Sequence, residues 1–511
     1  MPSNDEKWCS DTIAMVNPEL ALFRDMFPAN KENSTLETGA GSLRVESIDL
    51  EVEKRVVKKL DWRVMPLLSA LYLLSFLDRT NIGNARIAGM ESDLRLNGSQ
   101  YTWLLTIFYI SFITFQFQGV MWKIIPPHIW ATIVVFGWGL FATCQAAVHS
   151  WAGEMALRFL LGVAEAGFST GIPYLLSFFY RRQELGLRCG LFLAAAPVAN
   201  TFSGALAYAI TSGKSKIAPW RLLFLVEGLP TILMAPITFY FLPDSPSKAR
   251  FLNEEEKKVA EARAVRQVGR VDRVGNMDWK DAFSVLRDVK LWCGVLIYFN
   301  FAISYASLPV FLPTLLADMG FTAIDAQGLT APPFFLAILV TIGTTWAADR
   351  LQQRGIIVAI LCLVTVIGYV LLAACTSVAA RYAGVWIASC GLFAAVANTT
   401  PWLLNNQGSD NRRGMLSVVL SLLGQSGTLL GTNVFPDSER PRFIKGQTIC
   451  AAFVMFNFVT VVGLRTLLIY QNRKLDQKYG TIEQHRNRQD QENAILVVAE
   501  EDYGPNFRYV L

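Results

Sequence analysis

The chain has 511 residues, of which 52% are hydrophobic and only 17% are charged, and its mean hydropathy is +0.34. Soluble globular proteins carry about 25% charged residues, so this composition excludes a soluble enzyme. The net charge of +5 is small for the length and gives no reason to expect a nucleic-acid partner.

Apolar runs of about 20 residues recur along the chain, and each is long enough to cross a bilayer as a helix. They continue from about residue 64 to about residue 470, which excludes a single-anchor protein. A helix satisfies its own backbone hydrogen bonds in lipid, and the alternating strands of a membrane barrel are absent from the sequence. We therefore predict an all-α polytopic membrane protein with twelve spans, at roughly residues 64–84, 100–121, 129–148, 153–178, 189–211, 221–241, 291–316, 328–348, 356–375, 382–403, 415–435 and 448–469.

One connection between the predicted spans differs from the others. Most links are short, but residues 242–290 form a long, charged link that divides the spans six and six. This spacing is typical of secondary transporters built from two repeated bundles. The predicted division is a disordered tail over 1–60, a first bundle over 61–241, a linker over 242–290, a second bundle over 291–470 and a tail over 471–511.

Within the linker, the sequence predicts a solvated surface helix. Asn253 suits the N-cap position and three acids follow it, which favours a helix start. Glu254 and Lys258 are spaced to pair along one helix face.

Lysine and arginine are concentrated on one side of the predicted spans. They precede the first span, occur in the linker and follow the last span, and such residues favour the cytoplasmic side. We expect both termini in the cytoplasm, with no signal peptide and the first span acting as the membrane signal. Asn97, in the sequence Asn97-Gly98-Ser99, would then face outward as a candidate glycosylation site.

Residue types that bind metals or perform nucleophilic catalysis are scattered. The eight cysteines form no CxxC pair and mostly lie within apolar runs, where cysteine is usually a small buried hydrophobe. The three histidines lie far apart in sequence. We predict no metal, no cofactor and no enzymatic activity.

The first span carries two ionisable residues, Asp78 and Arg79, past its middle. Placing such a residue at the centre of a membrane helix costs at least about 2.5–3.5 kcal/mol, so these residues are usually functional. Adjacent residues point about 100° apart on a helix. One of the two can therefore line a cavity while the other contacts a neighbouring helix.

The fourth span carries Arg158 and Glu165, seven residues apart and therefore on one helix face. Small residues around Gly162 and Gly167 allow another helix to approach closely, and Pro173 can kink the span. Together the two spans hold two acids and two arginines.

These four residues predict a specific chemistry. An arginine can bind an anion through forked hydrogen bonds, and it keeps its proton, whereas a desolvated carboxylate can take one up near neutral pH. We assign Arg79 to substrate binding, Asp78 and Glu165 to proton coupling, and Arg158 to the coupling between substrate and proton. The alternative is a buried ion-pair network with a purely structural role.

Further polar residues within the spans are weaker candidates. We include Tyr109, Asn200, Asn398 and Trp402 with the two arginines as substrate-binding residues, and we interpret Glu227 as structural. The eighth span ends in an acid and two bases on a tight loop, where they can hold adjacent helices in one conformation. These candidate gating residues are Asp349, Arg350 and Arg354, for which positive-inside anchoring is the alternative.

At these residues the chain resembles the major facilitator superfamily, and more narrowly its anion:cation symporter group and the fungal allantoate permease branch. The resemblance runs from about residue 60 to 475. The segments that carry it are LDWRVMPLLSALYLLSFLDRTNIGNARIAGM, RFLLGVAEAGF, WRLLFLVEGLPT, LPDSPSKARFLNEEEK and WLLNNQGSDNRRGM.

The resemblance implies two six-helix bundles around a central site, alternating access and proton-coupled uptake of small organic anions. It implies a proton-binding acid and a substrate arginine at Asp78 and Arg79, and matching positions at Arg158 and Glu165. Substrates in the fungal branch include allantoate, nicotinate and pantothenate. The chain departs from the superfamily in the loop GVMWKIIPPHIW, which carries Lys123 but lacks the usual acid.

We therefore expect a monomeric plasma-membrane transporter that takes up a small carboxylate together with H⁺. Export of a small metabolite is the alternative, because sequence does not fix direction. A non-transporting nutrient receptor that signals through its tails is a third possibility.

Overall fold

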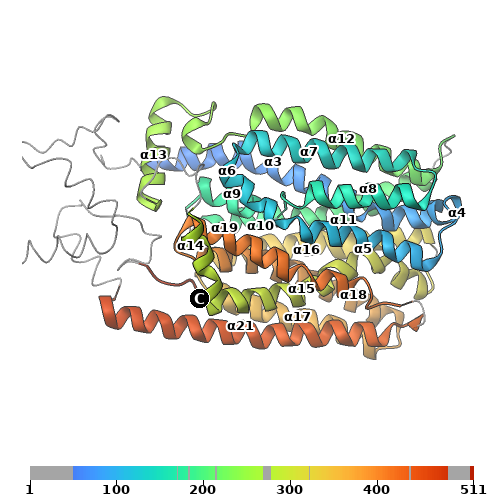
Figure 1. Ribbon diagram of the computed structural model, residues 1–511. Coiled ribbons are helices and arrows are strands. Elements are labelled where there is room, and N and C mark those ends of the chain that lie inside the picture. Colours follow the sequence, from blue (N-terminus) through green and yellow to red (C-terminus); the bar gives the residue numbers. More distant parts are fainter. Residues whose placement is uncertain are drawn as a thin grey trace, which may run out of the picture. The chain divides into compact units, whose positions relative to one another are not determined.

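The computed structural model describes residues 50–169, 171–181, 184–212, 216–268, 278–321, 323–436, 439–481 and 507–511. Within these residues every regular element is a helix, which confirms the all-α prediction (Figure 1).

The N-terminal bundle, α3 to α12, covers the first six predicted spans. Its main helices are α3 (Leu50–Ala85), α5 (Gly98–Thr114), α7 (Pro127–Cys144), α8 (Trp151–Glu165), α9 (Gly171–Phe179), α10 (Leu185–Leu193), α11 (Ala195–Ser212) and α12 (Pro219–Phe241). Its short elements are η1 (Arg86–Met90), α4 (Glu91–Asp93), η2 (Gln116–Val120), α6 (Met121–Ile124) and η3 (Gln145–Ala147).

The C-terminal bundle, α15 to α21, covers the last six predicted spans, and α17 and α21 pack side by side (Figure 1). Its elements are α15 (Val289–Asp318), α16 (Ala323–Leu351), α17 (Arg354–Ala374), α18 (Val378–Asn405), α19 (Asp410–Val419), η6 (Leu420–Gly424), α20 (Gly427–Gly431) and α21 (Ile444–Tyr479). Between the bundles lie η4 (Pro246–Lys248), α13 (Glu254–Val268), α14 (Trp279–Ser284) and η5 (Val285–Arg287). We call the end of the helices beside α13 and α14, at the left of Figure 1, the linker end.

Ten of the described helices are long and apolar enough to cross a membrane, and the bent pair Gly98–Thr114 and Gln116–Ile124 makes an eleventh span. The fourth predicted span corresponds to α8 and α9, which are separate helices in the structure. Each is shorter than a full span, and α8 carries Glu154, Arg158 and Glu165. The break and these charges explain why the fourth span does not qualify by length and hydropathy alone.

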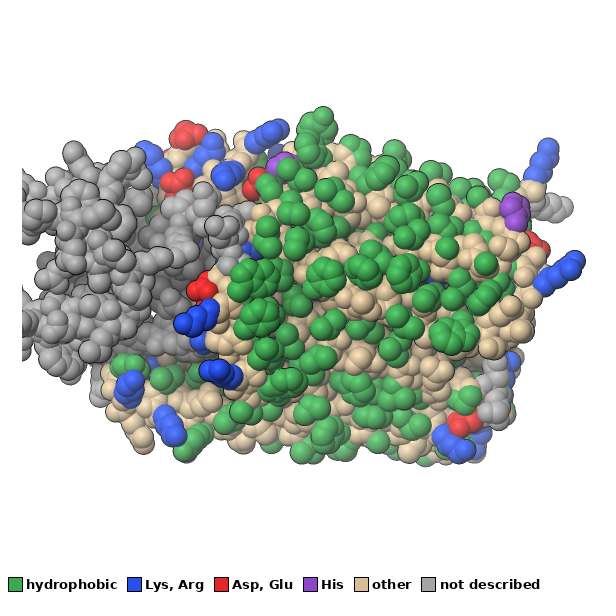
Figure 2. All heavy atoms as spheres, in the orientation of Figure 1, with side chains coloured by type: hydrophobic (Ala, Val, Ile, Leu, Met, Phe, Trp, Pro, Cys, Tyr) green, Lys and Arg blue, Asp and Glu red, His purple; other side chains and the backbone are tan. Residues whose placement is uncertain are grey.

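Side chains on the outer surface fit a lipid environment. Large hydrophobic residues on α7, α12 and α17, such as Ile133, Leu233 and Ile360, are more than half exposed. Figure 2 shows hydrophobic side chains over the middle of the visible face, whereas charged side chains gather at its two ends. Leaving this much apolar surface in water costs about 25 cal/mol per Å², so the band is suited to a bilayer core.

Both predicted tails need correction at their boundaries. Helix α3 begins at Leu50, within the segment assigned to the N-terminal tail, because its charged first turns extend the membrane helix. Helix α21 continues to Tyr479, and residues Phe507–Leu511 pack against the protein, with Phe507 only 1% exposed. The remaining parts of the two tails, 1–49 and 482–506, lie outside the described residues.

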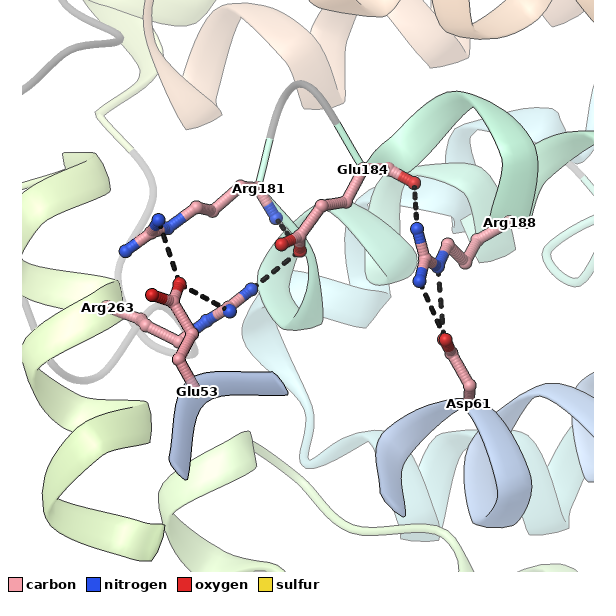
Figure 3. A network of polar contacts seen from close by, with 6 residues as sticks. All are labelled: Glu53, Asp61, Arg181, Glu184, Arg188 and Arg263. Atoms are coloured by element: carbon pink, nitrogen blue, oxygen red, sulfur yellow. Dashed lines mark hydrogen bonds and ion pairs between the residues drawn. The ribbon is translucent and has the colours of Figure 1, made fainter. Parts of the chain in front are cut away.

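The linker helix α13 is not the solvated helix that we expected. Arg263 donates to Glu53 of α3 at 2.7 Å and to Glu184 at 2.6 Å (Figure 3). In the same network Arg181 pairs with Glu53, and Arg188 of α10 pairs with Asp61 of α3. These ion pairs attach α13 to the linker end of the N-terminal bundle.

A second contact fixes the start of α13. Glu256 accepts a hydrogen bond from Lys59 of α3 at 2.8 Å. Burial opposes ionisation of Glu256, but the hydrogen bonds from Lys59 and the Asn253 backbone outweigh it, and the pKa of Glu256 lies below its ordinary value. On the exposed face Glu254 pairs with Lys257 rather than with the predicted Lys258.

Candidate functional site

A central cavity of about 70 Å³ lies between the two bundles, and Arg79 of α3 lines it. This volume holds several water molecules. Arg79 also lines two smaller neighbouring cavities, which lie toward the end opposite the linker end. The central lining comes from both bundles: Tyr72, Arg79, Ser169, Pro173 and Leu193 from the first, and Tyr298, Phe301, Ala302, Tyr305, Val396, Thr399, Thr400, Leu404, Ser417, Leu420, Ser421 and Gln425 from the second.

Arg79 forms an ion pair with Glu165, which ends α8 and is fully buried. The Arg79 Nε donates to Glu165 Oε1 at 3.1 Å, Arg79 Nη2 donates to the same oxygen, and Ser75 Oγ donates to it at 2.5 Å. Ser75 and Arg79 are four residues apart, so they share one face of α3. The other oxygen of Glu165 has no hydrogen-bond partner within the described part of the chain.

Aromatic rings surround the Arg79 guanidinium. Its central carbon lies 4.5 Å from the ring centroid of Phe112 and 5.5 Å from those of Phe76 and Phe108. Such cation–π contacts stabilise a desolvated cation. The guanidinium is therefore held in place while its side chain stays 10% exposed to the cavity.

Close packing of α8 on α5 places Glu165 at this depth. A methyl group on Gly162 would lie 2.1 Å from Ser111 Oγ and 2.6 Å from the Phe108 carbonyl oxygen. Only glycine permits this approach, as the small-residue pattern of the fourth span predicted.

Arg158 binds a different acid from the one that its spacing suggested. Its Nε lies 3.4 Å from Glu154, one turn earlier on α8, and its Nη1 donates to the Arg79 backbone oxygen at 3.4 Å. Glu154 and Arg158 are both at most 1% exposed. Arg158 lines one of the smaller cavities beside Arg79, so it lies next to the site without forming part of the central lining.

Asp78 points away from the cavities described above. It is 2% exposed and accepts a hydrogen bond from Thr231 of α12 at 3.0 Å. No salt bridge reaches it within the described residues. Glu227, one turn before Thr231, is equally buried and interacts electrostatically with Asp78. Asp78 and Arg79 thus diverge as predicted, and Asp78 belongs to a contact between α3 and α12.

The weaker substrate candidates separate into two groups. Tyr109 lines both smaller cavities beside Arg79, whereas Asn200, Asn398 and Trp402 are absent from the linings of the cavities described here. Asn398 donates to Thr344 and to a backbone oxygen of its own helix, and the Trp402 indole donates to the Val510 backbone oxygen at the linker end. Their assignment to substrate binding gains no support from this placement.

Aromatic and hydroxyl residues of the central lining are more prominent than sequence reasoning recognised. Tyr72 stacks on Phe192 at 4.3 Å and lies seven residues before Arg79, on the same face of α3. Tyr298 bonds Thr400, and Tyr305 packs edge-on against Phe76 across the two bundles. The seven-residue spacing from Arg79 was the available signal for Tyr72.

At the linker end the candidate gating residues form a contact between the bundles. Asp349 of α16 pairs with Arg354 of α17 and accepts from the Leu187 backbone N–H of α10 at 2.5 Å. A methyl group on Gly186 would collide with Arg354 Nη2, so glycine permits this approach. Arg350 instead lies over Trp346 and is exposed.

A second contact between the bundles involves the unusual loop. Lys123 of α6 donates to Asn411 of α19. In this loop, which lacks the acid usual in the superfamily, a lysine therefore makes the contact with an amide side chain of the other bundle.

Two further predictions concern a surface residue and a metal. Asn97 is exposed and caps α5 by accepting from the Gln100 backbone N–H; its glycosylation stays a prediction. Among the described residues no group of three or more His, Cys, Asp or Glu side chains could hold a metal ion.

Comparisons with known proteins identify the family. The Major Facilitator Superfamily profile matches residues 68–432. The chain is 34% identical to the MFS transporter prlL of a fungal species (strain NRRL 50135), over 86% of this chain and 91% of that protein. It is 31% identical to the high-affinity nicotinic acid transporter of Saccharomyces cerevisiae, over 84% and 80% of the two chains.

A solved structure shows the same fold. The proton:xylose symporter XylE aligns with a TM-score of 0.63 and 14% identity, over 79% of this chain and 95% of that chain. The fold of two six-helix bundles is therefore confirmed, and the chain belongs to the major facilitator superfamily of multi-pass membrane transporters.

Proposed function

We propose that this transporter carries a small carboxylate together with H⁺ into the cell by alternating access. The observation that supports this most is the Arg79–Glu165 ion pair at the central cavity. A guanidinium recognises a carboxylate through two parallel hydrogen bonds, and here it lies at the junction of three cavities.

The pair suggests how proton and substrate are coupled. Glu165 and an incoming carboxylate compete for the same guanidinium, because both hydrogen bonds that the Arg79 side chain donates go to Glu165 Oε1. When Glu165 takes up a proton, it loses its charge and releases Arg79 to the substrate. When the substrate leaves, Glu165 returns its proton and pairs with Arg79 again.

Charge distribution favours a cytoplasmic linker end. Lys54, Arg55, Lys58 and Arg63 of α3 lie at or near that end, as do Arg473 and Lys474 of α21. Positively charged residues remain on the cytoplasmic side during membrane insertion. Both termini would then be cytoplasmic, and we propose the plasma membrane as the location and the anion:cation symporter group as the branch.

Nicotinate is the first probe to test, because a relative is named a nicotinic acid transporter. Nicotinamide is the matched control, since it has nearly the same shape without the charge. We expect nicotinate, or another small carboxylate in a panel, to raise the thermal stability of the purified chain and to accumulate in proteoliposomes under an inward proton gradient. Equal responses to the acid and its amide, or transport of neutral compounds alone, would contradict anion selectivity.

Glu165→Gln tests the coupling. The variant mimics the protonated acid, so we expect substrate exchange to continue while proton-driven accumulation is lost. Glu227→Gln is the matched control, because it neutralises another buried glutamate of the same bundle that does not contact Arg79. Uphill accumulation by the Glu165→Gln variant would rule out Glu165 as the proton carrier.

A further inference from the structure

Residues Phe507–Leu511, which we call the docked segment, lie against the linker end of the C-terminal bundle. Figure 1 marks this end of the chain close to α21. The segment contacts four helices, α15, α17, α18 and α21, through hydrogen bonds from its backbone and side chains.

Two asparagines recognise consecutive residues of the segment by their backbones. Asn472 of α21 accepts from the Tyr509 N–H at 2.8 Å and donates to the Tyr509 oxygen at 2.9 Å. Asn406, which caps the end of α18, makes the same pair of bonds with Val510 at 2.8 and 3.0 Å. Each asparagine thus satisfies both polar groups of one peptide residue, as a neighbouring strand would.

The docked segment also satisfies backbone groups at two helix ends. The first N–H groups of a helix and its last carbonyls lack partners within the helix. The Leu511 oxygen accepts from the Gly355 N–H in the first turn of α17, at 3.1 Å. Arg508 donates to the Gly480 oxygen just after α21 at 2.6 Å and pairs with Asp476 at 2.7 Å.

Side chains complete the binding surface. Trp402 of α18, which is fully buried, donates from its indole to the Val510 oxygen at 2.9 Å. Lys290 of α15 donates to the Tyr509 hydroxyl at 3.1 Å and lies 4.3 Å from the centroid of its ring. A buried indole N–H and two asparagines that bond the backbone of one peptide segment form a binding site with defined polar partners.

The site lies next to the contacts that hold the bundles together. Gly355, which binds the segment, follows Arg354, which pairs with Asp349 at the junction with α10. Leu404, between Trp402 and Asn406 on α18, lines the central cavity. A contact that holds the ends of α17 and α18 in place therefore also holds one wall of the cavity and one side of the contact between the bundles.

We propose that this surface is a peptide-binding site for residues 507–511 of the same chain, and that docking of the segment holds the linker end closed. The segment must leave the site before that end opens. This inference is independent of the substrate and of the coupling ion.

Hydrogen exchange of the purified full chain tests the docking. We expect the Tyr509 and Val510 amides to exchange at least tenfold more slowly than in the free peptide, because both are bonded to asparagine oxygens. The double substitution Asn406→Leu and Asn472→Leu should bring both amides to the free-peptide rate. Val510→Ala is the matched control and should retain protection, since it keeps the backbone groups. Unprotected amides in the unaltered chain would overturn the docking.

Distance measurements between spin labels test the effect on the linker end. Labels replace the exposed residues Ile124 of the N-terminal bundle and Leu351 of the C-terminal bundle, in a chain whose native cysteines have been replaced. A chain that stops after residue 506 leaves every bundle residue unchanged, and its cooperative thermal unfolding is measured beside that of the full chain as the control for folding. We expect the long-distance population to rise at least threefold in the shortened chain. Identical distance distributions in the two chains would overturn the role in closure.

Discussion

The two bundles bury different kinds of polar group. The N-terminal bundle places six ionisable side chains within its helices, on α3, α8 and α12: Asp78, Arg79, Glu154, Arg158, Glu165 and Glu227. Within the described C-terminal bundle the buried polar groups between the helix ends are amides and hydroxyls, such as the Asn300–Asn457 pair at 2.9 Å. Its buried basic residues, including Lys290 and Arg354, occur close to the ends of helices.

This difference assigns separate tasks to the bundles. Carboxylates change protonation and amides do not, so the proposed proton uptake falls to the N-terminal bundle. The C-terminal bundle contributes Tyr298, Tyr305 and Thr399 to the cavity, which shape the site without carrying charge. If this division is correct, substitutions in the two bundles should affect transport and stability in different ways.

Among the single substitutions that compare the bundles, the largest effect on substrate affinity is expected from Arg79→Lys. Lysine keeps the positive charge but loses the planar fork that binds both oxygens of a carboxylate. A hydrogen bond to a charged group contributes about 1.5–3 kcal/mol, so loss of one such bond should lower substrate affinity about 10- to 100-fold. The measurement is binding of the identified carboxylate by thermal shift, together with its initial rate of uptake into proteoliposomes.

Tyr298→Phe provides the comparison from the other bundle for this first prediction. It removes a hydroxyl that bonds Thr400 in the same cavity and leaves all charges in place. We expect its affinity to change less than that of Arg79→Lys. A larger loss from Tyr298→Phe would mean that the C-terminal bundle, rather than Arg79, dominates recognition.

A smaller effect is expected where the bundles meet at the linker end. Asp349→Asn keeps an oxygen for the Leu187 N–H but removes the negative charge opposite the buried Arg354. Replacing a charge-assisted hydrogen bond by a neutral one removes about 1–2 kcal/mol from the closed arrangement. We expect the linker-end labels described above to show about a tenfold larger open population.

Arg350→Ala is the matched control for Asp349→Asn. Arg350 is a neighbour in sequence, but it is exposed and lies over Trp346. It should leave the distance distribution unchanged. An equal shift from both variants would indicate that positive charge at this loop, rather than the Asp349 contact, controls the linker end.

The sequence predicted the bundles well because hydropathy reports directly on burial in lipid. Every predicted span has a helix at its position, and the long charged link contains α13 and α14. The partners of buried charges were harder to predict. Spacing on α8 placed Arg158 and Glu165 on one face, but Glu165 pairs with Arg79 of α3, and Arg158 pairs with Glu154. Pairing between helices depends on how the helices pack, which hydropathy does not encode.

Contacts made by distant segments were not predictable for the same reason. Trp402 was interpreted as a weaker substrate-binding candidate because it is one of the few residues with a polar group within the spans of the second bundle. Its partner is the Val510 oxygen, 108 residues away in sequence. No local pattern links the two residues, so only the packed structure reveals that Trp402 binds residues 507–511.

The smallest effects are expected from replacing a polar pair in the C-terminal bundle by leucine. Asn300→Leu alone leaves Asn457 Oδ1 without its donor, which should cost about 0.6–2 kcal/mol of stability in a membrane helix pair. The double variant Asn300→Leu and Asn457→Leu removes both partners and should be nearly neutral in thermal stability and in uptake.

The corresponding double variant of the N-terminal bundle, Arg79→Leu and Glu165→Leu, should also fold, because replacing a buried ion pair by apolar side chains is often neutral. It should nevertheless abolish transport, since it removes both the proposed anion-binding group and the proposed proton carrier. Retention of coupled transport in that variant, or its loss in the asparagine variant, would break the division between a charged bundle that couples and a neutral bundle that shapes the site.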